Sequence, residues 1–221
     1  MREKFEKSKA DGAHHIINSL VGEWEGITKT WFEAGKLADE SPIKGKIKSL
    51  LHGRFVMHEY SGSLEGKPFE GIAIYGYSYE WEKFQCAWVD SFHMGSSTML
   101  AEGNNIDKGF SVTGTYGSTK MEQQWGWRTE LEVINEDQII ITADNISPEG
   151  EEAKALETIY RRKNNPNFLF NKNFLSDFNK ILLIKYKRHG SKTNSRRVSC
   201  SNTVFDYERC ARTNQIYARC I

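Results

Sequence analysis

Carboxylates alternate with large aromatic side chains in several short segments of this 221-residue chain. Trp88 and Asp90, for example, are two residues apart and would share one face of a β-strand. A carboxylate held among aromatic rings can accept hydrogen bonds from a ligand or act as a general acid or base. On this reasoning the candidate cavity residues are Met57, Glu59, Tyr75, Tyr77, Trp88, Asp90 and Glu102.

A structural role is the alternative for each of these acids. Alternation alone does not say which face of a strand is buried, so the carboxylates could face solvent while the aromatic rings fill a core. Asp90 ends its segment and could cap the following turn, and Glu102 before Gly103 is similar. We therefore assign no catalytic residue.

The histidines raise metal or haem binding as a further alternative. His14 and His15 are adjacent on an expected helix and point about 100° apart, so they do not readily share a metal. A site would need His58 or His93 turned inward. The sequence has no zinc motif, no Gly-x-Ser-x-Gly segment and no phosphate-binding loop, so no metal or other cofactor is predicted.

The elements that must position these side chains are short strands. Runs of aromatic and β-branched residues recur at regular intervals between Gly, Asn, Asp and Pro, which is typical of antiparallel β proteins. The pattern predicts strands over 23–32, 43–51, 55–64, 69–79, 84–91, 96–102, 109–116, 121–133, 138–145 and 155–162. A short helix capped by Asp11 precedes them. Ten strands joined by short turns must either stack as a two-sheet sandwich or close into a barrel. Closure into a barrel removes the exposed sheet edges.

The two ends of this strand series carry residues that could close a barrel. Gly22-Glu23-Trp24 opens the first strand, and Arg161 and Arg162 end the last. In lipocalins and related calycins, an Arg or Lys of the last strand lies over the Trp of such a Gly-x-Trp. A guanidinium on an indole gains a cation–π contact, and its donors can cap carbonyl groups. We therefore predict an all-β, antiparallel calycin-like β-barrel of about 8–10 strands, closed by Trp24, Arg161 and Arg162.

A longer series of short motifs resembles one family. The motifs are Leu20–Gly26, Gly53–Val56, Gly66–Gly71, Gly76-Tyr77, Trp88–Asp90, Glu102-Gly103, Gly150, Glu157 and Tyr160–Lys163. In this order and spacing they resemble the uncharacterised bacterial family domain of unknown function 1579, over about Ala13 to Lys163. The resemblance implies a lipocalin-like barrel and no established activity. Ser78 departs from the pattern, where the family is expected to have Asp.

Charge divides the chain near Arg162. The segment from Lys163 to Ile221 has 12 Lys and Arg against three Asp and Glu, whereas the rest has 18 against 26. We expect a barrel domain over 1–162 and a basic tail over 163–221, disordered or partly helical. Because its composition changes abruptly after the last family motif, we hypothesise that the tail is read-through sequence.

A small-molecule carrier or sensor is the function that these patterns favour. The expected ligand is an apolar or amphipathic, lipid-like molecule that would bind inside the barrel. The alternatives are an isomerase or hydrolase that uses inward-facing carboxylates, and a haem- or metal-binding barrel. No secretory signal and no run of about 18 apolar residues is visible, so we expect a cytoplasmic protein without a membrane or nucleic-acid partner. A homodimer stays open.

Overall fold

The fold is known from a computed structural model that describes residues 2–163. The predicted tail over 163–221 falls, apart from Lys163, outside the described residues. The same applies to the read-through hypothesis. The described residues thus belong to the acidic part of the chain.

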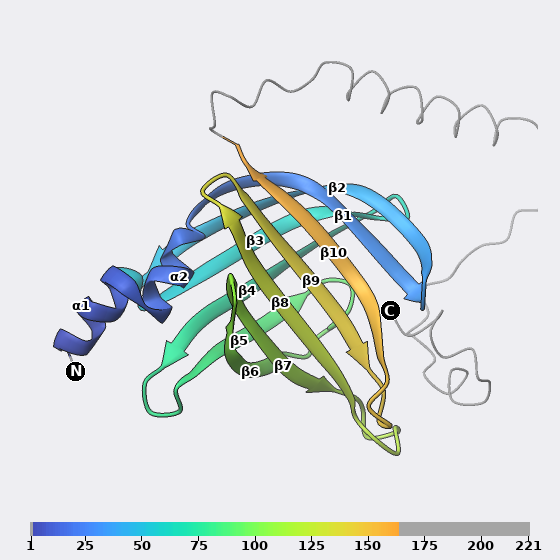
Figure 1. Cartoon of the computed structure of the whole chain (residues 1–221). Helices are drawn as coiled ribbons and strands as arrows, with labels where there is room; N and C mark the ends of the chain where they lie inside the picture. Colours follow the sequence, from blue (N-terminus) through green and yellow to red (C-terminus); the bar gives the residue numbers. More distant parts are fainter. Residues whose placement is uncertain (1, 164–221) are drawn as a thin grey trace, which may run out of the picture. The chain divides into compact units, whose positions relative to one another are not determined.

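Ten antiparallel strands close into a barrel within the described residues (Figure 1), so the predicted fold class is confirmed. Each strand pairs with its neighbours in sequence, and β1 closes the barrel by pairing with β10. The strands are β1 (Gly22–Glu33), β2 (Lys36–Leu50), β3 (Phe55–Leu64), β4 (Lys67–Ser78), β5 (Lys83–Asp90), β6 (Met99–Ile106), β7 (Gly109–Tyr116), β8 (Trp125–Asn135), β9 (Gln138–Ile146) and β10 (Glu152–Arg162).

The strand β2 begins seven residues earlier than predicted. Its first residues are rich in acidic and small side chains, which have low β-propensity and led to the later predicted start. Pairing with β1 overrides that preference, since Glu33 pairs with Lys36 across a tight turn. Gly35 lies in this turn with φ 72°, a conformation that favours glycine.

Two helices, α1 (Arg2–Asp11) and α2 (Ala13–Ser19), lie at one end of the barrel (Figure 1). The prediction that Asp11 caps the helix was wrong, because Asp11 ends α1 and Gly12 precedes α2. Ile17 of α2 is fully buried, as is Leu20 just after it, and both belong to the barrel core. The side chains of α2 thus form a plug, and we call this end the capped end.

The capped end is packed with apolar side chains. Phe84 and Phe110 stack with ring centroids 4.5 Å apart and planes at 7°. Val56 and Leu131 are fully buried in the same core. Close packing of this kind is the main source of stability in a small domain.

Trp24 and Arg162 meet at this end. The guanidinium lies 4.3 Å from the centroid of the indole ring. Its three nitrogens donate hydrogen bonds to the carbonyl oxygens of Glu136 (2.7 Å), Val21 (2.7 Å) and Ser19 (3.2 Å). Trp24 Nε1 donates to the carbonyl oxygen of Leu20 at 2.9 Å, which links the indole to the end of the helical segment.

Arg162, and not Arg161, makes this closing contact. Arg161 is exposed, since alternate residues of a strand point to opposite faces. A Cβ on Gly22 would lie 2.1 Å from Nη1 of Arg162, so the close approach of the guanidinium requires glycine there.

In the part of the chain that the structure describes, neither helix has the length and apolar content needed to cross a membrane.

Candidate functional site

A cavity of about 80 Å³ lies inside the barrel, away from the packed core of the capped end. Inward-facing side chains of most strands line it, and they are mainly aliphatic and aromatic. His93, from the segment 91–98 between β5 and β6, is the lining residue that does not come from a strand. We call this part of the interior the cavity end.

His58 and Tyr160 form one polar pair on the cavity wall. The Tyr160 hydroxyl and His58 Nε2 are 3.3 Å apart, and both side chains are almost completely buried. Burial lowers the pKa of His58 to about 4 and raises the pKa of Tyr160 far above its ordinary value. Both groups are therefore neutral at physiological pH.

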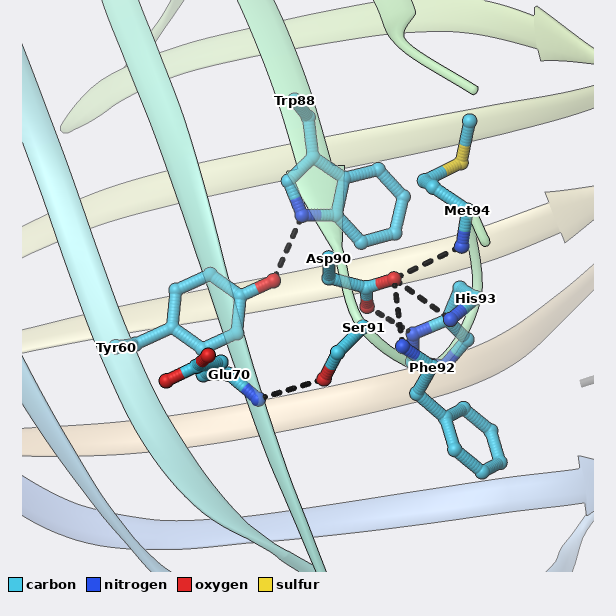
Figure 2. A network of polar contacts seen from close by, with 8 residues as sticks. All are labelled: Tyr60, Glu70, Trp88, Asp90, Ser91, Phe92, His93 and Met94. Atoms are coloured by element: carbon cyan, nitrogen blue, oxygen red, sulfur yellow. Dashed lines mark hydrogen bonds and ion pairs between the residues drawn. The ribbon is translucent and has the colours of Figure 1, made fainter. Parts of the chain in front are cut away.

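Tyr60 and Trp88 form a second polar pair. Trp88 Nε1 donates a hydrogen bond of 2.7 Å to the Tyr60 hydroxyl (Figure 2). Burial, with the nearby negative charge of Asp90, raises the pKa of Tyr60 well above its ordinary value. The hydroxyl accepts from the indole and keeps its own proton available for donation.

Two glycines make room for the polar side chains of β3. Gly45 of β2 and Gly71 of β4 both pair with Tyr60 of β3 in the sheet. A Cβ on Gly71 would lie 2.2 Å from the Tyr60 hydroxyl oxygen. A Cβ on Gly45 would lie 2.8 Å from His58 Nε2. The glycines thus allow the polar side chains of β3 to lie against the interior wall.

Tyr75 and Cys86 complete the neutral wall on neighbouring strands. They pair directly across β4 and β5, and both are buried. Burial raises the pKa of Tyr75 well above its ordinary value and raises that of the Cys86 thiol to about 12. Cys86 is accordingly a protonated, weakly nucleophilic core residue, since the thiolate is the reactive form.

Asp90 ends β5 and organises the turn that follows. Its Oδ1 accepts hydrogen bonds from the backbone N–H groups of Phe92 (3.2 Å), His93 (2.6 Å) and Met94 (2.8 Å). Its Oδ2 lies 2.5 Å from His93 Nδ1 (Figure 2). Ser91 Oγ accepts a hydrogen bond from the N–H of Glu70, which holds the turn to β4.

The carboxyl of Asp90 is ionised despite its burial. Burial alone would raise its pKa, but the hydrogen bonds from the His93 ring and from the backbone N–H groups outweigh that effect and lower it. The Asp90 side chain thus caps the turn after β5, which is the structural role that the sequence offered as its alternative to ligand binding.

The His93 ring lies among tryptophans. Its centroid is 5.7 Å from that of Trp88 and 5.8 Å from that of Trp127. The two indoles stack on each other at 5.5 Å with planes at 20°. The cavity thus has one aromatic wall beside an imidazole whose Nδ1 is bound to a carboxylate.

The structure brings some of the predicted site residues together. Tyr75 and Trp88 line the cavity, and the Asp90 carboxylate lies behind His93. Tyr77 also faces inward, but at the capped end, where its ring packs against Phe84. Its distance along β4 from the cavity is the physical reason for this difference.

Met57, Glu59 and Glu102 do not lie in the cavity, so their predicted positions were wrong. In β3 the buried residues on either side of Met57 are Val56 and His58, which places Met57 and Glu59 on the outer face. Glu59 forms an ion pair with Lys48 there. Glu102 is exposed on β6. Of the three predicted cavity carboxylates, Asp90 alone faces inward. The enzyme alternative depended on such inward carboxylates.

Several residues that line the cavity were not predicted to do so, among them His58, Tyr60, His93, Trp127 and Tyr160. His58 and Tyr60 alternate with Met57 and Glu59, so choosing the wrong face of one strand exchanged the two pairs. Trp127 could have been identified from the sequence, because it shares one face of its strand with Thr129 and Leu131.

Metal binding gains no support from the described residues. Among residues 2–163, no group of three or more His, Cys, Asp or Glu side chains is placed to hold a metal ion. His58 and His93 both line the cavity, where one ring nitrogen of each has a polar partner: the Tyr160 hydroxyl for His58 and the Asp90 carboxylate for His93.

Comparison with families and curated proteins gives one match. The family model described as Protein of unknown function (DUF1579) matches residues 9–162. None of the curated proteins compared with the chain matches it.

Several solved structures are similar. Rv2717c from M. tuberculosis is 10% identical, with a TM-score of 0.48 over 68% of this chain and 97% of that one. The S-type phycobiliprotein lyase CPES from Guillardia theta is 12% identical, with a TM-score of 0.47 over 73% and 98%. The odorant binding protein OBP1 is 9% identical, with a TM-score of 0.31 over 77% and 85%.

Proposed function

The chain belongs to the family Protein of unknown function (DUF1579), and we propose that its barrel binds a small, uncharged molecule in the interior cavity. The observation that carries this proposal is the composition of the cavity wall. Among the described residues, those that line it include no Lys, Arg, Asp or Glu. Transferring an ion into such a neutral interior is costly, so the wall selects against charged ligands.

The cavity volume sets the size of the ligand. Drug-sized molecules occupy pockets of about 300–1,000 Å³, and an apolar cavity of about 150 Å³ binds benzene. The cavity of about 80 Å³ is smaller than both. This supports a ligand no larger than a single small ring, which is at the small end of the apolar or amphipathic, lipid-like molecules that the sequence suggested, and it does not favour haem.

Polar groups on the wall would orient the ligand. The Tyr60 and Tyr160 side chains and the His93 ring bring hydrogen-bonding atoms to a mainly apolar surface. Ligand pockets commonly combine an apolar lining with a few polar groups of this kind. A molecule with one polar edge and one apolar face would match this distribution.

Furan is a suitable first probe, because it is a flat, uncharged five-membered ring. We expect its titration to shift the indole N–H signals of Trp88 and Trp127 in ¹H–¹⁵N NMR spectra. The Ala143→Leu variant, which fills the cavity wall between β8 and β10, should lose these shifts.

Ala87→Leu provides the matched control for this experiment. Ala87 lies on the outer face of β5, between the inward residues Cys86 and Trp88, so the same enlargement leaves the cavity unchanged. It should preserve the furan shifts. Equal furan responses in the two variants, or none in the wild-type protein, would contradict the proposal.

A further inference from the structure

The imidazole of His93 is held in one orientation by the turn from which it projects. Asp90 Oδ1 already accepts three backbone N–H groups, so the carboxylate cannot rotate without losing them. The remaining oxygen, Oδ2, is the one that meets His93 Nδ1. The exposed fraction of the Asp90 side chain is 0% and that of His93 is 11%, so water competes little with this contact.

This contact determines which ring nitrogen carries the proton. An ionised carboxylate only accepts hydrogen bonds, so a neutral His93 must hold its proton on Nδ1. Nε2 then carries a lone pair and is an acceptor. Carboxylates orient catalytic and metal-binding imidazoles by the same interaction.

Nε2 of His93 has no hydrogen-bond partner among residues 2–163. Nδ1 is the His93 ring atom with a hydrogen bond or ion pair to the described residues, and Nε2 has none. The ring nevertheless lines the cavity. A ligand in the cavity would therefore meet an imidazole with a free acceptor, beside the stacked rings of Trp88 and Trp127.

We propose that His93 is the recognition residue of the cavity, and that its Nε2 accepts a hydrogen bond from an N–H or O–H group of a flat, uncharged ring. Asp90 is the positioning residue that keeps Nε2 in the acceptor state. This inference rests on the proposed function and deepens it by naming the ligand class. Aromatic faces favour planar ligands, and the fixed acceptor favours donors.

Three five-membered rings of nearly equal size test the inference. Pyrrole has an N–H donor, furan has no donor, and oxazole has a ring nitrogen that accepts. At pH 8.5 we expect the wild-type protein to bind pyrrole about three- to tenfold more tightly than furan, since one uncharged hydrogen bond has a value of that order. Oxazole should bind no better than furan.

His93→Phe removes the acceptor but keeps a ring at the position. Its affinities for pyrrole and furan should become equal, while furan still binds. An undiminished preference for pyrrole in this variant would overturn the assignment of His93.

Asp90→Asn is the sharper test, because it reverses the tautomer. The amide oxygen can keep the three backbone N–H groups, and the amide nitrogen then donates to His93 Nδ1. Nε2 must carry the proton and become a donor. We expect oxazole to bind more tightly than pyrrole in this variant, an inversion that loss of packing would not produce.

The outcomes separate this inference from the proposed function. If furan binds but neither the pyrrole preference nor its inversion appears, the role of His93 is wrong and the cavity proposal stands. If none of the three rings binds the wild-type protein, both proposals fail. ¹⁵N chemical shifts of the His93 ring report the tautomer directly, and an unprotonated Nδ1 in the wild-type protein would also overturn the inference.

Discussion

The capped end and the cavity end of the barrel are built from the same strands, yet they differ in packing. At the capped end, Ile17 and Leu20 plug the barrel and the rings of Phe84 and Phe110 stack, all of them buried. At the cavity end the inward positions carry Tyr60, Trp88 and other aromatic groups with polar edges, and a cavity of about 80 Å³ remains.

The difference shows that alternation alone does not produce a filled interior. At about 24 cal/mol per Å³, a cavity of this size costs about 2 kcal/mol of folding free energy. The tight core of the capped end offsets this cost. The division of the barrel into a stabilising half and a binding half is the interpretation that the following experiments test.

Truncating a core residue at each end should give the largest difference in stability between the two ends. Leu131→Ala at the capped end should lower the free energy of unfolding by about 4–5 kcal/mol, because it opens a new cavity in tight packing. Met99→Ala should cost only about 2–3 kcal/mol, because Met99 already borders a cavity. Urea unfolding measures both values. A cost for Met99→Ala equal to or above that of Leu131→Ala would contradict the division.

The pH dependence of stability is expected to have the next largest effect. His58 has a pKa of about 4 in the folded state against an ordinary 6.5, so the unfolded chain binds the proton more tightly. Its contribution is fully present above pH 6.5 and is lost as pH falls toward 4. Between pH 7.5 and 4.5 the loss should be about 2–3 kcal/mol.

Urea unfolding of the wild-type protein and of His58→Phe at both pH values isolates this contribution. The variant keeps a ring but cannot titrate, so its stability should fall less by that amount. Parallel pH profiles for the two proteins would mean that solvent reaches His58 and that the cavity end is more open than its geometry indicates.

The closing arginine should have the smallest of the three effects. Arg162→Ala removes the contact with the Trp24 ring and three hydrogen bonds to carbonyl groups. Because the side chain is only half-buried, we expect a loss of about 1–3 kcal/mol in thermal or urea unfolding. Arg161→Ala is the matched control on the outer face and should change stability by less than about 0.5 kcal/mol. Equal effects would show that the guanidinium of Arg162 does not seal the capped end.

The fold was largely predictable because its signals are local. Turn residues bounded most of the strands, and Gly22 with Trp24 marked the first strand of a closed barrel. The start of β2 was the main error, since pairing with β1 extends it through residues of low β-propensity. Strand pairing depends on the partner strand, so local composition could not show it.

The candidate site was less predictable, and β3 shows why. Either face of this strand is compatible with burial. One face carries Phe55 and Met57, and the other carries Val56 and His58. The outer face of the barrel also carries large apolar residues: Phe55, Ile72, Ile74, Val89 and Leu100 are all more than one-third exposed. Hydrophobicity therefore did not distinguish the two faces.

Three features can be read from the sequence: which residues share a face, where most strands turn, and which residues could close the barrel. They follow from the two-residue period of a strand and from turn chemistry. Which face points inward, and which side chains meet, depends on how the strands close into the barrel. Closure of β1 on β10 sets the inside and outside of every strand at once. Contacts such as that of His58 with Tyr160, 102 residues apart, then follow from the shape of the barrel.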